Sequence, residues 1–244
     1  MKQTRILMDM HVTVEIVDRV TSSVFDEIYD YFSYIDDTFS TFKKTSEITK
    51  INEGTLTPKQ YSNDMADVLA LCEQTKKESD GFFDIHRNGK LDPSGLVKGW
   101  AINNAATMLK QKGLTNYYVD AGGDIQVSGH NEKGKPWTIG IRNPFNVKEI
   151  VKVLRITSEG VATSGIYERG NHVYNPKNHK PVTDIVSLTV IGPNVYESDR
   201  FATAAFAMGP AGITFIDRMN NFEGYMIDKN GMATYTQGFE KFVA

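Results

Sequence analysis

The chain has one cysteine, no long apolar run and no Pro/Ser-rich linker, and each absence excludes a class of protein. Cys72 is the only cysteine among 244 residues, which excludes an internal disulfide and a thiolate metal cage. Its apolar surroundings favour a buried helix cysteine over a nucleophile. No apolar stretch reaches the length of a signal-peptide core or a membrane span. We therefore expect a cytoplasmic protein that inserts into no membrane.

The charge of the chain also argues against one class of partner. The formal net charge is −3 and no block of Lys or Arg dominates, which argues against a general nucleic-acid partner. Hydrophobic residues make up 40% of the chain and charged residues 23%, a composition typical of a globular protein. Without a linker, we predict that residues 1–244 form a single domain.

Hydrophobic periodicity predicts an α+β fold, because strands joined mostly by hairpins are accompanied by helices arriving in groups. Alternating apolar residues predict the strands, and apolar residues at helical spacing predict the helices. The expected strands are His11–Val17, Tyr117–Asp120, Ile125–Ser128, Trp137–Arg142, Val151–Ile156 and Ser187–Ile191, with a last hairpin over Gly224–Tyr235. The expected helices are Val24–Phe39, Asn63–Ser79, Leu96–Gln111, Asp199–Met208 and Ala211–Met219.

The segment from Lys90 to Ala101 carries the strongest local signal. Asp92 can end a strand, and small residues then turn the chain into the helix that starts near Leu96. A helix start of this kind presents N–H groups and a positive dipole end that suit phosphate. Lys98, in the first turn, adds a full positive charge. The alternative is an ordinary strand-turn-helix in which an Asp or Ser caps the helix.

Two further segments join polar groups to glycine. Asp120 to Asp124 lies between two expected strands, where glycines let a ligand approach the backbone and Asp124 can bind a hydroxyl or amide. A plain hairpin turn is the alternative. Thr163 and Ser164 stand beside Gly165 at a strand end, where hydroxyls commonly cap the backbone.

The segment from His172 to Lys177 adds an imidazole, an amide and a lysine within six positions. Strand alternation places His172 and Tyr174 on one face, and Asn175 enters a turn fixed by Pro176. A single His is more often structural than catalytic. The polar neighbours of His172 favour a functional role only modestly.

Asp199 and Thr203 form the best candidate for a metal site. Their i,i+4 spacing places a carboxylate and a hydroxyl on one helix face. Two oxygen ligands with positions left for water and phosphate suit Mg²⁺. The alternative, favoured by spacing alone, makes Asp199 a helix N-cap and Thr203 a small core residue.

Taken in order along the chain, these segments resemble the ApbE-type FAD:protein FMN transferases. Early matches are Phe39–Phe42 with Ser46–Ile48 and Ile51–Asn52, which look like the family's FSTY…SEI…LN segment. The resemblance covers roughly residues 8–209, with these further matches: Gly81–Asp84 to G-x-F-D, Asp92–Ala101 to D-x-x-G-x-x-K-G-x-A, Asp120–Asp124 to D-x-G-G-[DE], Thr163–Gly165 with Tyr167 to T-S-G-x-Y, His172–Lys177 with Pro181–Val182 to H-I-x-D-P-x-T-G-x-P, and Ser198–Asp199 with Ala202–Ala204 to A-D-x-x-A-T-A.

The resemblance implies a T-fold-like α+β domain of antiparallel sheet layers packed with helices, with FAD as substrate and Mg²⁺ as cofactor. The reaction would move the FMN moiety of FAD onto a Ser or Thr hydroxyl of an acceptor flavoprotein and release AMP. It implies Mg²⁺ ligands at Asp199, Thr203 and the main-chain carbonyl of Gly95. Lys98 would counter negative charge, and His172 would act as a base or positioning group. The implied FAD contacts are Met8, Phe42, Asp92, Lys98, Asp124, Thr163, Ser164, His172 and Asn175.

Several positions depart from the family pattern. Phe42 replaces a Tyr, which keeps a ring for flavin stacking but removes its hydroxyl, and Asn175 replaces an Asp. Met8 matches the family's M-G-T poorly. The family's longer form has a W-G-F segment before the Asp box, and only Ile85–Leu91 fills that interval here. Two alternatives share these residues: a Mg²⁺-dependent FAD pyrophosphatase and a non-catalytic flavin-binding module.

Overall fold

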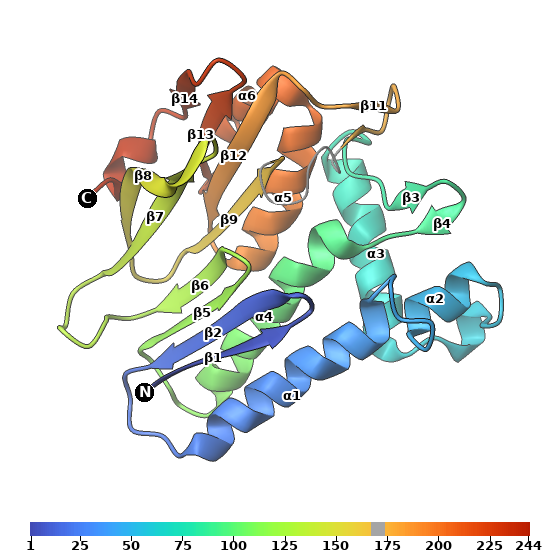
Figure 1. Ribbon diagram of the computed structural model, residues 1–244, viewed down its shortest axis with the longest axis horizontal. Coiled ribbons are helices and arrows are strands. Elements are labelled where there is room, and N and C mark those ends of the chain that lie inside the picture. Colours follow the sequence, from blue (N-terminus) through green and yellow to red (C-terminus); the bar gives the residue numbers. More distant parts are fainter. Residues whose placement is uncertain (167–173) are drawn as a thin grey trace.

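An eight-stranded antiparallel sheet forms the centre of the molecule (Figure 1). A computed structural model describes residues 1–166 and 174–244 of the chain. The strands in their order across the sheet are β1 (Lys2–Leu7), β2 (Met10–Ile16), β5 (Tyr117–Ala121), β6 (Asp124–Ser128), β9 (Gly160–Gly165), β12 (Ile185–Gly192), β13 (Glu223–Asp228) and β14 (Ala233–Tyr235).

The long helices cover one face of this sheet. Helix α1 (Ser22–Phe39) and helix α4 (Ser94–Gln111) pack with α3 (Asn63–Glu78) over β2 and β5. Helix α5 (Val195–Ala207) and the short α6 (Gly212–Asp217) cover β9, β12 and β13. In β2, Val12, Val14 and Ile16 are fully buried, as their alternation predicts.

A long hairpin covers the other face of the C-terminal half of the sheet. Strands β7 (Trp137–Asn143) and β8 (Asn146–Ile156) pair with each other. Their apolar residues pack against the outward side of β6, β9, β12 and β13, together with Phe239 of a terminal 3-10 turn (Phe239–Phe242). Helices, sheet and hairpin thus make three layers over that half of the sheet.

Small elements gather at one end of the molecule, at the right of Figure 1. They are α2 (Glu47–Asn52), a 3-10 turn (Pro58–Gln60), the hairpin of β3 (His86–Arg87) and β4 (Lys90–Leu91), and the hairpin of β10 (Tyr174–Asn175) and β11 (Lys180–Pro181). These elements lead into the start of α4 or lie near it, so they surround the segment that the sequence singled out.

The predicted α+β, T-fold-like class is confirmed, and the predicted helices and strands are found with small shifts of their ends. The largest shift is in β8, which begins at Asn146 rather than Val151. Helix α5 begins four residues early, at Val195, because the Asn194 side chain caps it by accepting from the Glu197 N–H. Asp199 therefore lies inside the helix, and the N-cap alternative for it is wrong. Cys72 is buried, and burial raises the pKa of its thiol to about 12. No helix in the described ranges is long and apolar enough to cross a membrane.

Candidate active site

The site is built where α4 and α5 cross at very close range. Gly99 makes the approach possible, because a Cβ atom at this position would lie 2.5 Å from Asp199 Cβ and 2.8 Å from the Val195 carbonyl oxygen. The Gly99 N–H donates a hydrogen bond of 2.7 Å to Asp199 Oδ2. The crossing thus positions the Asp199 carboxylate against the backbone of α4.

One turn away, Thr203 meets Gly95 in the same way. The Thr203 hydroxyl donates to the Gly95 carbonyl oxygen at 3.1 Å, and a Cβ atom at Gly95 would lie 3.0 Å from Thr203 Cγ2. The three groups named as metal ligands, Asp199, Thr203 and the Gly95 carbonyl, are therefore brought together. The resemblance, not the spacing alone, indicated the Gly95 carbonyl.

Asp124 closes the cluster from the sheet. This residue begins β6 and is only 1% exposed. Its Oδ1 accepts from the Thr163 N–H at 3.0 Å, and Lys98 Nζ lies 2.7 Å from its Oδ2. Lys98 lies in the second turn of α4, because the helix begins at Ser94 rather than at Leu96. Lys98, Asp124 and Thr163 belong to three sequence segments that were considered separately, and the fold makes them neighbours.

The electrostatics of the cluster favour a bound cation. Asp199 is 5% exposed. Burial and then the neighbouring Asp124 carboxylate raise the pKa of Asp199 well above its usual value, while Lys98 and the Gly99 N–H act in the opposite direction. A hard divalent cation beside Asp199 would relieve this penalty. The carboxylate, hydroxyl and carbonyl oxygens present are the donors that Mg²⁺ prefers, so these residues fit that ion.

The number of protein donors is small. Residues 1–166 and 174–244 contain no group of three or more His, Cys, Asp or Glu side chains arranged to hold a metal. A Mg²⁺ ion at Asp199 would therefore take further oxygens from water and from a phosphate ligand, as is usual for Mg²⁺ sites.

The turn between β5 and β6 is held by Asp120. The Gly123 N–H donates to Asp120 Oδ1, and the Tyr118 hydroxyl donates to Asp120 Oδ2, each at 2.9 Å. Gly122 and Gly123 have φ of +60° and +90°, which favours glycine. Burial raises the pKa of Asp120. Asp120 shapes the turn, whereas Asp124 points into the cluster. The hairpin turn is therefore present, and ligand binding by Asp124 stays a prediction.

The other residues expected to contact FAD lie outside this cluster. Asp92 follows β4 and accepts from the Ser94 N–H at 3.1 Å, so it also shapes the start of α4. The Thr163 hydroxyl shares a hydrogen bond of 2.9 Å with that of Thr189 on β12, and Ser164 is half-buried beside it. Phe42 is 91% exposed in the loop after α1, which excludes a core role.

Met8, Asn175 and His172 complete the expected set. Met8 is half-buried in the β1–β2 turn with φ of +54°. Asn175 forms a turn, in which its Oδ1 accepts from the Lys177 N–H at 2.9 Å. His172 and Tyr167 lie outside the described residues. Among the described residues, we see no direct contact of Phe42, Met8 or Asn175 with the Asp199 cluster. A single ligand that touches both would have to span the space between these residues and the cluster.

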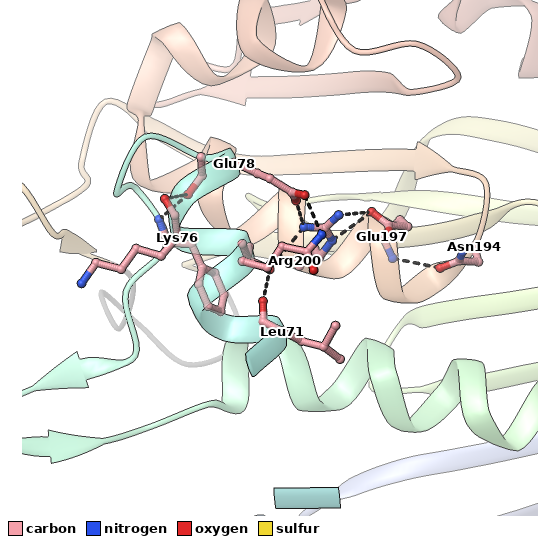
Figure 2. A network of polar contacts seen from close by, with 10 residues as sticks. Leu71, Lys76, Glu78, Asn194, Glu197 and Arg200 are labelled. Carbon is pink, nitrogen blue, oxygen red and sulfur yellow. Dashed lines mark hydrogen bonds and ion pairs between the residues drawn. The ribbon is translucent and has the colours of Figure 1, made fainter. Parts of the chain in front are cut away.

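Sequence reasoning missed Arg200, the neighbour of Asp199 on α5. Arg200 is 5% exposed, and its guanidinium donates to Glu197 on the same helix and to Glu78 at the end of α3 (Figure 2). It also donates to the Thr75 hydroxyl at 3.2 Å. Arg200 therefore ties α5 to α3 and helps hold Asp199 in place. The available signal was an Arg directly before the mostly apolar run Phe201–Ala207.

The fold is that of flavin transferases. The Vibrio cholerae flavin transferase ApbE superposes with a TM-score of 0.86 over 99% of this chain and 98% of its own, at 20% identity. The ApbE protein of Thermotoga maritima gives 0.87 over 100% and 99%, also at 20% identity. A sequence model described as the ApbE family matches residues 8–88 and 85–226, so the chain belongs to the ApbE family.

Curated relatives carry the name FAD:protein FMN transferase. The Klebsiella pneumoniae protein is 31% identical over 63% of this chain and 45% of its own length. The Escherichia coli K12 protein is 32% identical over 58% and 43%. The chain thus matches less than half the length of these two relatives. The Haemophilus influenzae protein is 26% identical over 86% of this chain and 80% of its own.

Proposed function

We propose that the chain is a Mg²⁺-dependent FAD:protein FMN transferase that releases AMP. The observation that carries the proposal is the convergence of Asp199, Thr203 and the Gly95 carbonyl at the α4–α5 crossing, with Lys98 and Asp124 beside them. Family membership and the names of the relatives support the choice of FAD as substrate.

The reaction balances as a phosphoryl transfer. The oxygen of a Ser or Thr hydroxyl on an acceptor flavoprotein attacks the phosphorus of the FMN half. A new P–O bond forms, the P–O bond to the AMP phosphate breaks, the hydroxyl loses its proton and AMP leaves. Positioning and charge neutralisation supply most of the acceleration in such reactions. Mg²⁺, when bound, would neutralise and polarise the pyrophosphate.

The residues of the chain have separate tasks in this scheme. Asp199, Thr203 and the Gly95 carbonyl would hold Mg²⁺. Lys98, anchored by Asp124, would place positive charge toward the pyrophosphate. His172 would position the acceptor hydroxyl or take its proton, a role that rests on the family resemblance. Phe42 would stack on the flavin ring.

A mass measurement on an acceptor protein tests the proposal. Purified chain is incubated with Mg²⁺, FAD and a candidate acceptor flavoprotein domain, and a matched reaction contains EDTA. The expected result is a gain on the acceptor equal to FMN less water, with one AMP released per flavin, only when Mg²⁺ is present. FMN and AMP in solution without an acceptor adduct would instead support a pyrophosphatase. No FAD turnover with any metal would support a flavin-binding module.

A further inference from the structure

The short helix α2 connects the Phe42 loop to the segment before Asp92. At its start, Ser46 is fully buried and its hydroxyl donates to the Ser40 carbonyl at 2.7 Å, two residues before Phe42. The same hydroxyl oxygen accepts from the Thr49 N–H at 3.2 Å and caps the helix. The start of α2 is therefore joined to the Phe42 loop.

At its other end, α2 is joined to β4 by Asn52. The Asn52 amide donates to the Leu91 carbonyl at 2.9 Å and accepts from the Leu91 N–H at 2.7 Å. One side chain thus satisfies both backbone groups of Leu91, as a neighbouring strand would. Asp92 follows directly, and its own N–H donates to the Ile85 carbonyl at 2.8 Å. The main chain on both sides of the Leu91–Asp92 bond is fixed.

Helix α2 itself is held rigidly between these two attachments. Ile48 is fully buried in the core beneath it, and the Glu47 carboxylate accepts from the Ser62 N–H at 2.7 Å. Its six residues span about 9 Å at 1.5 Å per residue. The loop that carries Phe42 and the Asp92 segment are consequently held at a set separation, with Asn52 as the joint on the Asp92 side.

We infer that Asn52 is a specificity-determining positioning residue that makes the site select ligands carrying the flavin ring and a phosphate together over ligands carrying only one of the two. The inference rests on the proposed function, in which Phe42 meets the flavin ring and the Asp92–Lys98 segment meets the phosphates. A ligand that spans both places gains because its second half binds as an intramolecular event. That gain requires the two places to stay at the separation that FAD demands. Riboflavin has the ring but no phosphate, and AMP has a phosphate but no flavin ring, so each reaches one place only and gains nothing from the joint.

The test compares three ligands on Asn52→Ala. Dissociation constants for FAD, riboflavin and AMP are measured by titration calorimetry with the full chain and Mg²⁺. We expect FAD affinity to fall by about tenfold or more, since linking two binding places commonly contributes about 10²–10⁴ in affinity. Riboflavin and AMP affinities should stay within about twofold, because neither ligand spans the joint. Equal loss for all three ligands, or unchanged FAD affinity, would overturn the inference.

Asn116→Ala is the matched control. Asn116 also joins distant segments, since its amide donates to Asp18 and accepts from the His130 N–H, each at 2.9 Å. It precedes β5 at the end opposite Asp124, so its loss should lower stability without changing the ratio of FAD to riboflavin affinity. If Asn52→Ala does not fold, Asn52→Asp is measured instead, because it keeps the acceptor for the Leu91 N–H and loses only the donor to the Leu91 carbonyl. The same ratio of affinities is then compared with that of the wild type.

The outcome separates this inference from the proposed function. Loss of FAD selectivity in a chain that never flavinylates an acceptor would support the joint and reject the transferase. Flavinylation by a wild-type chain whose Asn52 variants keep full FAD selectivity would support the transferase and reject the joint.

Discussion

Gly99 and Asp199 lie a hundred residues apart, yet the N–H of one donates to the carboxylate of the other at 2.7 Å with no room for a methyl group between them. This contact fixes the distance between α4 and α5. Because the proposed Mg²⁺ ligands come from both helices, the separation of the helices sets the geometry of the site.

Gly99→Ala should therefore reduce activity more than its small size suggests. The new Cβ would lie 2.5 Å from Asp199 Cβ, so the helices must separate. We expect a loss of about 1–3 kcal/mol in the free energy of unfolding from overpacking, and at least about tenfold in turnover from the displaced carboxylate. Gly95→Ala is the comparison, since its Cβ would meet the Thr203 methyl at 3.0 Å and needs a smaller shift. Thermal unfolding and AMP release measure both effects. A Gly99→Ala enzyme with wild-type turnover would contradict the argument.

Asp199→Ala should abolish turnover while only weakening FAD binding. The substitution removes the single carboxylate among the proposed Mg²⁺ ligands but leaves Phe42, Lys98 and Asp124, the residues proposed to contact FAD. Calorimetry with FAD and an AMP-release assay across a Mg²⁺ series provide the measurement. Asp217→Ala, a substitution on α6 away from the cluster, is the control. Full activity in the Asp199 variant would remove the metal from this position.

Phe42→Ala should weaken FAD binding, and Phe42→Tyr should be tolerated. Stacking contributes roughly 1–3 kcal/mol in comparable base–aromatic contacts, which corresponds to a loss of about 5- to 150-fold in affinity. Because the side chain is 91% exposed, neither substitution should lower the melting temperature by more than a degree or so. Calorimetry and thermal unfolding of both variants check this. Unchanged FAD affinity in the alanine variant would show that the ring does not meet the flavin.

Arg200→Met should destabilise the chain in a pH-dependent way. Burial acts to raise the pKa of Glu78, but hydrogen bonds from Arg200 and Gln74 outweigh it and hold this pKa below its usual value. A lowered carboxyl pKa contributes stability that is present above the ordinary Glu pKa of about 4.3 and is lost as the pH falls through the lowered value. Wild type and variant should thus differ most at pH 6, by about 2 kcal/mol, and converge below pH 4.

Melting curves from pH 3 to pH 7 measure this difference. Lys229→Met, which removes an exposed ion pair with Asp184 at 3.3 Å, is the control and should change little at any pH. A gap between wild type and Arg200→Met that stays constant with pH would show that Arg200 acts through packing on Phe201 rather than through Glu78.

The local features of the site were predictable because they depend on nearby residues. Asp120 to Asp124 forms the expected hairpin turn, and α4 begins within the small residues after Asp92, at Ser94 rather than at Leu96. The start of α5 was missed because Asn194, which caps it, lies five residues before the expected beginning at Asp199. Local capping signals compete, and spacing alone does not decide between them.

The long-range relations were not predictable from spacing. Lys98 meets Asp124, and Asn52 binds Leu91, through tertiary packing between segments far apart in the chain. The order of motifs indicated that such residues belong to one site, but not which atoms meet. His172 stays a prediction, because it lies outside the described residues.

We propose that Lys177 and Lys180 form a docking edge for the acceptor. Lys180 is exposed, whereas Lys177 Nζ lies 2.6 Å from Asp80 Oδ2 and 4.3 Å from the centre of the Phe82 ring. Asp80 is itself largely exposed, so an acidic acceptor segment can compete for Lys177 at little cost.

Replacing both lysines with Ala should slow acceptor modification more than FAD hydrolysis, and the defect should shrink as salt rises. Rates of acceptor mass gain and AMP release from about 50 to 500 mM salt, across the range where screening sets in, measure both reactions. Lys133 and Lys135, in the loop before β7, give the matched double variant, which should leave both rates unchanged. Equal losses in the two reactions would assign Lys177 and Lys180 to the cofactor instead.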